Sequence, residues 1–204
     1  MRISLFRFTA LPLLLFLALP MFAQEWEFAK EKDGIKVYTK KEKGNDLKTF
    51  RGVMEISSTM AKIRNLVGNV HNREWWDDDV KEVKVLYFEE NRHFKYYILY
   101  DVPWPMADRD LCVDAKVTED PVTGRRQIMA TPLPNLVPEK DGVVRIKNYW
   151  QKWDIQPLEN GRIRLTLEGF VDPAGSVPSW LYNMVITETP IRVMGNVKSR
   201  VETK

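Results

Sequence analysis

The chain has 204 residues, of which 44% are hydrophobic and 29% are charged. This composition is ordinary for one globular domain and excludes a collagen-like chain, a disordered chain and a small disulfide-bonded scaffold. The formal net charge is +3, and the single cysteine, Cys112, excludes an intramolecular disulfide and a paired-cysteine metal or redox site.

Residues 1–23 have the pattern of a secretory signal peptide. Two arginines precede an apolar run from Leu11 to Leu19, and the small Ala23 ends the segment. The run is too short to cross a bilayer, which needs about 20 apolar residues. We therefore expect cleavage after residue 23 and export of residues 24–204, as one domain, to the periplasm or outside the cell. Without the two arginines the net charge falls to +1, which gives little support for a nucleic-acid partner.

The middle of the chain alternates between apolar and polar residues, which predicts half-buried antiparallel strands. In the segment 162–171, for example, Ile163, Leu165 and Leu167 share one face. Turn residues such as Asn160-Gly161 separate successive strands and predict hairpins. We expect strands at residues 34–40, 47–56, 80–89, 93–101, 109–118, 125–131, 143–155 and 162–171.

Two segments have helical spacing instead. Ser57 and Ser58 can cap a helix whose apolar residues recur from Met60 to Val67. The second segment begins at Pro178, a residue suited to a first helical turn, and Pro190 is expected to kink or restart that helix. A long amphipathic helix is therefore expected to close the chain.

Signatures of common enzyme classes are missing from the sequence. The two histidines, His71 and His93, fall on different predicted elements, and no GxGxxG or GxxxxGK[ST] string occurs. The acidic run 77–79 is interpreted as a solvated turn, and Cys112 as an incidental thiol. We expect no catalytic residue, no metal ion and no cofactor.

Four strings occur in order along the chain: NREWWD (72–77), PWPMADRD (103–110), GVVRIKNY (142–149) and DPAGSVPSWL (172–181). Together they resemble the START family of lipid-binding domains, closest to its phosphatidylcholine transfer branch, from Trp26 to near the C-terminus. The resemblance implies an α+β helix-grip fold. In that fold a curved antiparallel β-sheet wraps around a long C-terminal helix, and an internal apolar cavity between them holds one lipid.

The residues themselves also predict two apolar walls, one on the sheet and one on the final helix. Such walls either pack together or enclose a ligand; packing is the commoner outcome in general, whereas the resemblance favours a cavity. The expected apolar lining residues are Ile98, Val113, Trp180, Leu181, Met184 and Val185.

The resemblance also implies polar contacts with a lipid headgroup. Arg73 and Asp77 occupy the Arg and Asp positions of an Arg-x-x-Trp-Asp string that meets the headgroup in phosphatidylcholine-binding relatives. Tyr149 and Gln151 match polar lining positions of the same relatives. From the residues alone, Arg73 and Asp77 are equally well explained as a solvated ion pair on a helix. Arg109, by contrast, is interpreted as forming a structural charged pair with its neighbour, Asp110.

The relatives surround choline with aromatic side chains at positions that align with Val67, Ile98 and Val113. Aromatic faces are the main means of recognising a quaternary ammonium group. We therefore expect a fatty acid, a sterol-like molecule or a non-choline phospholipid as the ligand.

The function expected from the sequence is lipid binding in the cell envelope, with the lipid either carried or sensed. The protein is expected to act as a monomer that touches a membrane surface transiently. The alternative is a helix-grip enzyme, similar to a cyclase or hydrolase, that acts on a hydrophobic substrate in the same cavity.

Overall fold

The computed structural model describes residues 25–73, 75–76 and 79–202. The predicted signal peptide and Asp77 lie outside these residues. The described chain forms one ten-stranded sheet in which nine strands follow the order β1-β2-β3-β10-β9-β7-β6-β5-β4, and β8 pairs with β6. The strands are β1 (Glu27–Lys32), β2 (Ile35–Lys41), β3 (Lys48–Ser57), β4 (Val80–Glu89), β5 (His93–Tyr100), β6 (Asp108–Glu119), β7 (Arg126–Pro132), β8 (Val143–Arg145), β9 (Tyr149–Pro157) and β10 (Arg162–Val171).

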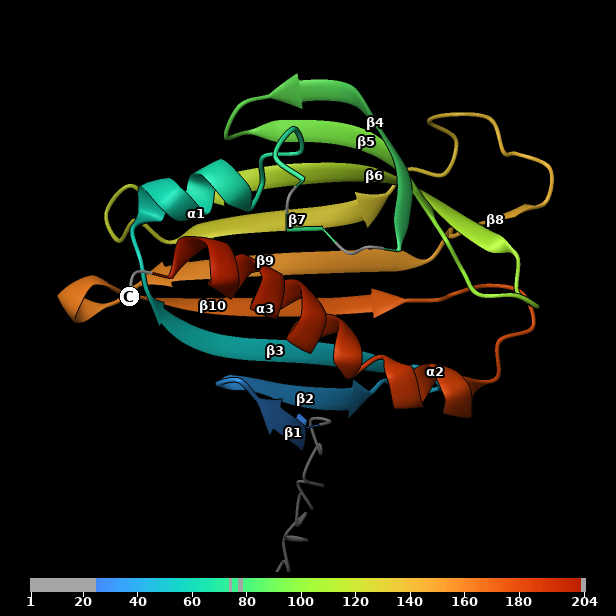
Figure 1. The fold of residues 1–204 in the computed structure, drawn as a ribbon, viewed down its shortest axis with the longest axis horizontal. Coiled ribbons are helices and arrows are strands. Elements are labelled where there is room, and N and C mark those ends of the chain that lie inside the picture. Colours follow the sequence, from blue (N-terminus) through green and yellow to red (C-terminus); the bar gives the residue numbers. More distant parts are fainter. Residues whose placement is uncertain (1–24, 74, 77–78, 203–204) are drawn as a thin grey trace, which may run out of the picture.

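Three α-helices accompany the sheet: α1 (Met60–Leu66), α2 (Ser179–Val185) and α3 (Glu188–Val201). Figure 1 shows α3 crossing β9, β10 and β3 obliquely, with α2 at one end of the sheet and α1 at the other. The sheet is antiparallel except for the pairing of β8 with β6. The predicted α+β helix-grip architecture is therefore confirmed.

The alternation of apolar and polar residues along each strand explains which face of the sheet is buried. On β10, Ile163, Leu165 and Leu167 are at most 2% exposed, while Arg164 between the first two is exposed and Thr166 is half-buried. The turn before β10 places Asn160 and Gly161 at φ values of 57° and 70°. Asn and Gly tolerate this left-handed conformation, which is why the pair predicted the hairpin correctly.

Two strands differ from the prediction. Strand β1 was not expected, because its sequence EFAKEK is almost entirely exposed and lacks the alternation of a half-buried strand. It lies at the edge of the sheet, where charged side chains are common because they discourage pairing with other chains. The single strand expected at 143–155 is divided into β8, which runs parallel to β6, and β9, which pairs with β7 and β10.

The C-terminal helix is divided as well. Helix α2 ends at Val185 and α3 begins at Glu188, so that Pro190 lies in the first turn of α3. A proline is tolerated there because its missing N–H would have no partner within the helix. The predicted restart at Pro190 is therefore confirmed.

Helix α3 approaches the sheet closely at Gly52 of β3. A Cβ atom at Gly52 would lie 2.5 Å from Sδ of Met194 and 2.7 Å from Cβ of Pro190. Met194 and Val197 are completely buried against the sheet. Only a residue without a side chain permits this packing.

The predicted charged pair between Arg109 and Asp110 is wrong. Neighbouring residues of a strand point to opposite faces, so their side chains cannot meet. Asp110 instead accepts two hydrogen bonds from Arg145 of β8, at 2.6 Å and 2.9 Å, and both side chains are 1% exposed. Arg145 also donates to backbone carbonyls of the loop 133–142, which it holds against the sheet.

Candidate functional site

A cavity of about 480 Å³ lies between the sheet, helix α2 and the start of α3. Its volume falls within the range of ligand pockets, roughly 300–1,000 Å³. Apolar and aromatic side chains supply most of its wall. Ile98 and Leu111 come from the sheet, and Leu181, Val185 and Ile186 come from the region of α2.

Strand register sets the long direction of the cavity. Tyr96, Ile98 and Tyr100 alternate on one face of β5, and Tyr100 pairs with Arg109 of β6. Six residues further along β6, Ala115 pairs with Phe94. At about 3.3 Å per residue, the distance from Arg109 to Ala115 along the strand is roughly 20 Å.

The cavity opens at the end of the sheet where β5 finishes and β6 begins. Its exposed lining residues are Asp79, Asp101, Pro103, Met106, Val185 and Arg192. These residues lie on the loop 101–107, on α2, at the start of α3 and just before β4. We call this opening the mouth.

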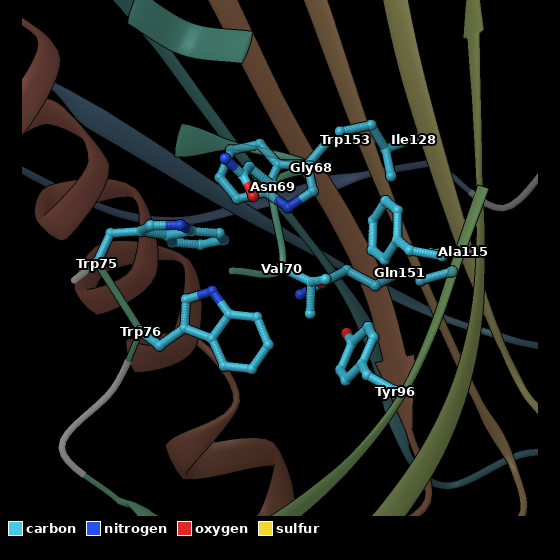
Figure 2. Close-up of a pocket in the computed structure, with 12 residues that line it drawn as sticks. Gly68, Asn69, Val70, Trp75, Trp76, Tyr96, Ala115, Ile128, Gln151 and Trp153 are labelled. Carbon is cyan, nitrogen blue, oxygen red and sulfur yellow. The ribbon is translucent and has the colours of Figure 1, made fainter. Parts of the chain in front are cut away.

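A second, smaller cavity of about 40 Å³ lies further inside. Gly68 and Val70, which follow α1, line it together with small and apolar residues of the strands. It shares Trp75, Trp76, Tyr96 and Gln151 with the main cavity. In Figure 2, Trp75 and Trp76 face Tyr96 and Gln151 across this junction. We call the smaller cavity the inner chamber.

Neutral polar groups lie where the two cavities meet. Tyr149 donates a hydrogen bond to Oε1 of Gln151, at 3.3 Å. Burial raises the pKa of Tyr149 well above 10.0, and the nearby Tyr96 and Tyr100 raise it further. Burial also raises the pKa of Tyr96. These phenols therefore stay protonated near neutral pH and serve as hydrogen-bond donors. The indole nitrogen of Trp76 is buried and has no hydrogen-bond partner among the described residues.

The structure places five of the predicted site residues on the main cavity. They are Ile98, Tyr149, Gln151, Leu181 and Val185.

Four other predicted residues line neither cavity. Arg73 is exposed in the segment after α1, and Val113 is completely buried in the core, opposite Tyr96 on β5. Trp180 and Met184 are 67% and 60% exposed on the outer face of α2. The remaining predicted residue, Asp77, lies outside the described residues.

The helical repeat explains the division within α2. Leu181 and Val185 are four residues apart and line the cavity, whereas Trp180 and Met184, also four apart, lie about 100° around the helix on a more exposed side. The sequence of α2 is apolar on several sides, so it contains no signal that identifies the inner face.

The aromatic lining comes from positions other than the three that align with the choline-binding aromatic residues of the relatives. Val67 and Val113, two of the three aliphatic replacements, line neither cavity. Trp75, Trp76 and Tyr96 do line them. Of the three aligned positions, Ile98 lines the main cavity, so the case against choline recognition rests on that position.

Within residues 25–73, 75–76 and 79–202, no group of three or more His, Cys, Asp or Glu side chains is placed to hold a metal ion. No helix in the same part of the chain is long and apolar enough to span a bilayer. Cys112 is buried, and burial raises the pKa of its thiol.

Comparison with known proteins gives consistent matches in sequence and in structure. The START domain profile matches residues 21–203. An uncharacterized protein of Pseudomonas aeruginosa is 31% identical over 184 residues, covering 89% of each chain. Phosphatidylcholine transfer protein of Rattus norvegicus is 28% identical over 165 residues, covering 78% of this chain and 75% of that protein.

Solved structures have the same fold. The STAR-related lipid transfer protein of Xanthomonas axonopodis superimposes with a TM-score of 0.77 at 26% identity, over 85% of this chain and 97% of that one. Human StAR-related lipid transfer protein 5 gives a TM-score of 0.76 at 19% identity, over 86% of each chain. The second likeness concerns the fold alone.

Proposed function

The chain belongs to the START domain family, and from this premise we propose that it binds one lipid in its internal cavity. The lipid is then carried between membranes, or sensed, in the cell envelope. The proposed ligands are a fatty acid, a sterol-like molecule or a non-choline phospholipid. The observation that carries this proposal is a largely apolar cavity of about 480 Å³ with an open mouth.

The energetics of apolar burial support a lipid ligand. Each methylene group removed from water contributes about 0.8 kcal/mol, so a chain of fourteen carbons offers roughly 11 kcal/mol before the entropy cost of binding. Similar proteins bear names that refer to lipid transfer, including the Rattus norvegicus phosphatidylcholine transfer protein and the Xanthomonas axonopodis STAR-related lipid transfer protein.

The distribution of charge favours a carrier over an enzyme. Four charged side chains line the main cavity in the described part of the chain, namely Asp79, Asp101, Arg109 and Arg192, and all lie near the mouth. The inner chamber is lined there by apolar and neutral polar residues. General acid–base catalysis requires an acid or base next to the bound substrate. The described residues of the inner chamber supply no charged group for this role.

We propose that the mouth widens to admit a lipid when α2 moves together with the loop 101–107. Helix α2 is tied to the start of β3 by few contacts. Asn183 accepts a hydrogen bond from the backbone N–H of Lys48 and donates one to the carbonyl of Asp46, both at 2.8 Å. The Tyr182 hydroxyl donates to the carbonyl of Lys48 at 3.2 Å.

Replacing Asn183 by alanine is expected to speed lipid exchange. The change removes both hydrogen bonds of Asn183 and destabilises the closed position of α2 by about 1 kcal/mol, which corresponds to a roughly fivefold rise in the open population. Exchange of a fluorescent lipid between vesicles measures the effect. Ser199→Ala, which removes an exposed hydroxyl bonded within α3, is the control. An unchanged rate in Asn183→Ala would show that α2 is not the moving element.

Native mass spectrometry, followed by solvent extraction, tests the proposed function. The protein is purified from the envelope fraction of its own cells. We expect one lipid molecule per chain, and an intact mass that corresponds to a chain beginning after residue 23. Recovery of no lipid would contradict lipid binding. Phosphatidylcholine as the tightest ligand in competition would contradict the proposed ligand class.

A further inference from the structure

Arg109 is a buried cation on the wall of the cavity. It is 7% exposed and belongs to the first residues of β6, next to the mouth. Its Nε donates to the carbonyl of Pro173 at 3.3 Å, and its Nη1 donates to the carbonyl of Ala107. A guanidinium group has five N–H donors, so these two bonds leave most of its donors uncommitted.

No acidic side chain of the described residues forms an ion pair with Arg109. The other three charged side chains that line the cavity in the described part of the chain have ion-pair partners of their own. Arg192 pairs with Asp79 at 3.5 Å, and the carboxylate of Asp101 pairs with Lys81 at 2.7 Å. Lys81 also pairs with Asp108. The neighbouring Asp110 points to the other face of the sheet, where it binds Arg145.

A buried charge without a counter-charge is unfavourable, because neutral carbonyl groups compensate only part of the lost hydration. Among the described residues, backbone carbonyls of two loops hold the Arg109 group in place, and these do not neutralise it. A guanidinium group that is held in place and still has free N–H donors can bind an oxyanion through two parallel hydrogen bonds.

We propose that Arg109 binds the acidic polar end of the ligand, a carboxylate or a phosphate group attached to a hydrocarbon chain. This inference rests on the proposed function and narrows the class of lipid. It places the charged end of the lipid at the mouth and directs the hydrocarbon chain toward the inner chamber.

The polarity along the cavity agrees with this orientation. Arg109 lies at the mouth, the neutral donors Tyr149 and Gln151 lie in the middle, and Ala115 lies in the inner chamber. The path from Arg109 to Ala115 along β6 is roughly 20 Å, long enough for an extended single hydrocarbon chain. Figure 2 shows the aromatic side chains of Trp76 and Tyr96 at the inner chamber, together with Ala115.

Three probes with the same sixteen-carbon chain test the inference. Delipidated protein is titrated with hexadecanoate, hexadecyl phosphate and hexadecanol, and binding is followed by the fluorescence of the cavity tryptophans. We expect at least one anion to bind about tenfold or more tightly than the alcohol. The anion that binds more tightly identifies whether a carboxylate or a phosphate is the natural partner.

Arg109→Gln is expected to abolish the preference for the anion while changing the affinity for hexadecanol less than about twofold. Arg109→Lys, which keeps the charge but not the fork, is expected to retain part of the preference. Arg164→Gln removes an exposed arginine that pairs with Glu55 and serves as the matched control. Thermal melts of each variant show that the fold is intact.

The outcomes separate this inference from the proposed function. Failure of all three probes to bind the unaltered protein would overturn both. Binding of all three without a preference for an anion would overturn only the role of Arg109. An equal loss of affinity for all probes in Arg109→Gln would also overturn it, since this would show that Arg109 merely holds the two loops. If that variant does not fold, titration of the unaltered protein at falling pH decides: protonation of hexadecanoate should remove its advantage over hexadecanol.

Discussion

Replacing Arg145 by methionine is expected to lower the free energy of unfolding by about 3–5 kcal/mol, the cost of leaving a buried carboxylate without its partner. Asp110 is 1% exposed and receives two hydrogen bonds from Arg145. The same guanidinium also binds carbonyls of Pro134, Val137 and Pro138. Methionine fills a similar volume but supplies none of these donors. Urea denaturation followed by fluorescence measures the change.

The matched control for this experiment is Lys147→Met. Lys147 lies two residues further along and pairs with Glu139 at 2.8 Å, but both side chains are more than half exposed. An exposed pair of this kind contributes less than about 1 kcal/mol. A similarly small loss in Arg145→Met would contradict the structural role assigned to the buried pair.

The second large effect concerns the surface around the mouth. Trp104 is 92% exposed on the loop 101–107, and Trp180 is 67% exposed on α2. Large aromatic side chains in water are unfavourable but are suited to the interface of a bilayer. The double variant Trp104→Ser and Trp180→Ser is therefore expected to slow lipid transfer between vesicles by at least about 100-fold, since each buried aromatic side chain contributes about 1.5 kcal/mol or more.

The same double variant is expected to keep its bound lipid, because neither tryptophan lines the cavity. Transfer between vesicles and lipid content after purification are measured in parallel. Phe28→Ser, which removes a 60% exposed aromatic side chain from β1, is the control. Unchanged transfer in the double variant would exclude membrane contact through these two residues.

These experiments address different steps of one proposed cycle. The tryptophan pair concerns docking, Asn183 concerns opening, and Arg109 concerns recognition of the lipid. Arg145 lies on the opposite face of the sheet and concerns only stability. A change in stability without a change in ligand preference, or the reverse, therefore indicates which part of the molecule is affected.

The sequence predicted most of the sheet because burial on one face imposes a period of two on each strand. The segments that became β2 to β7 and β10 have this pattern. Strand β1 was missed because it lies at an edge and buries almost nothing. The boundary between β8 and β9 was missed because residues 146–148, which separate the two strands, contain no glycine or proline to mark a break.

The sequence by itself determined the family, the helix-grip architecture, and several residues of the cavity, including Tyr149, Gln151 and Leu181. The architecture follows from local periodicity together with the four sequence motifs that occur in order along the chain, and the family and the cavity residues follow from the resemblance that these motifs carry. Only the tertiary structure decided which side of α2 faces inward, because an apolar residue favours burial equally in protein or in a membrane. It also showed that Asp110 pairs with Arg145 and not with Arg109. The partner of a buried charge depends on which strands lie next to each other in space, and these strands are distant in sequence.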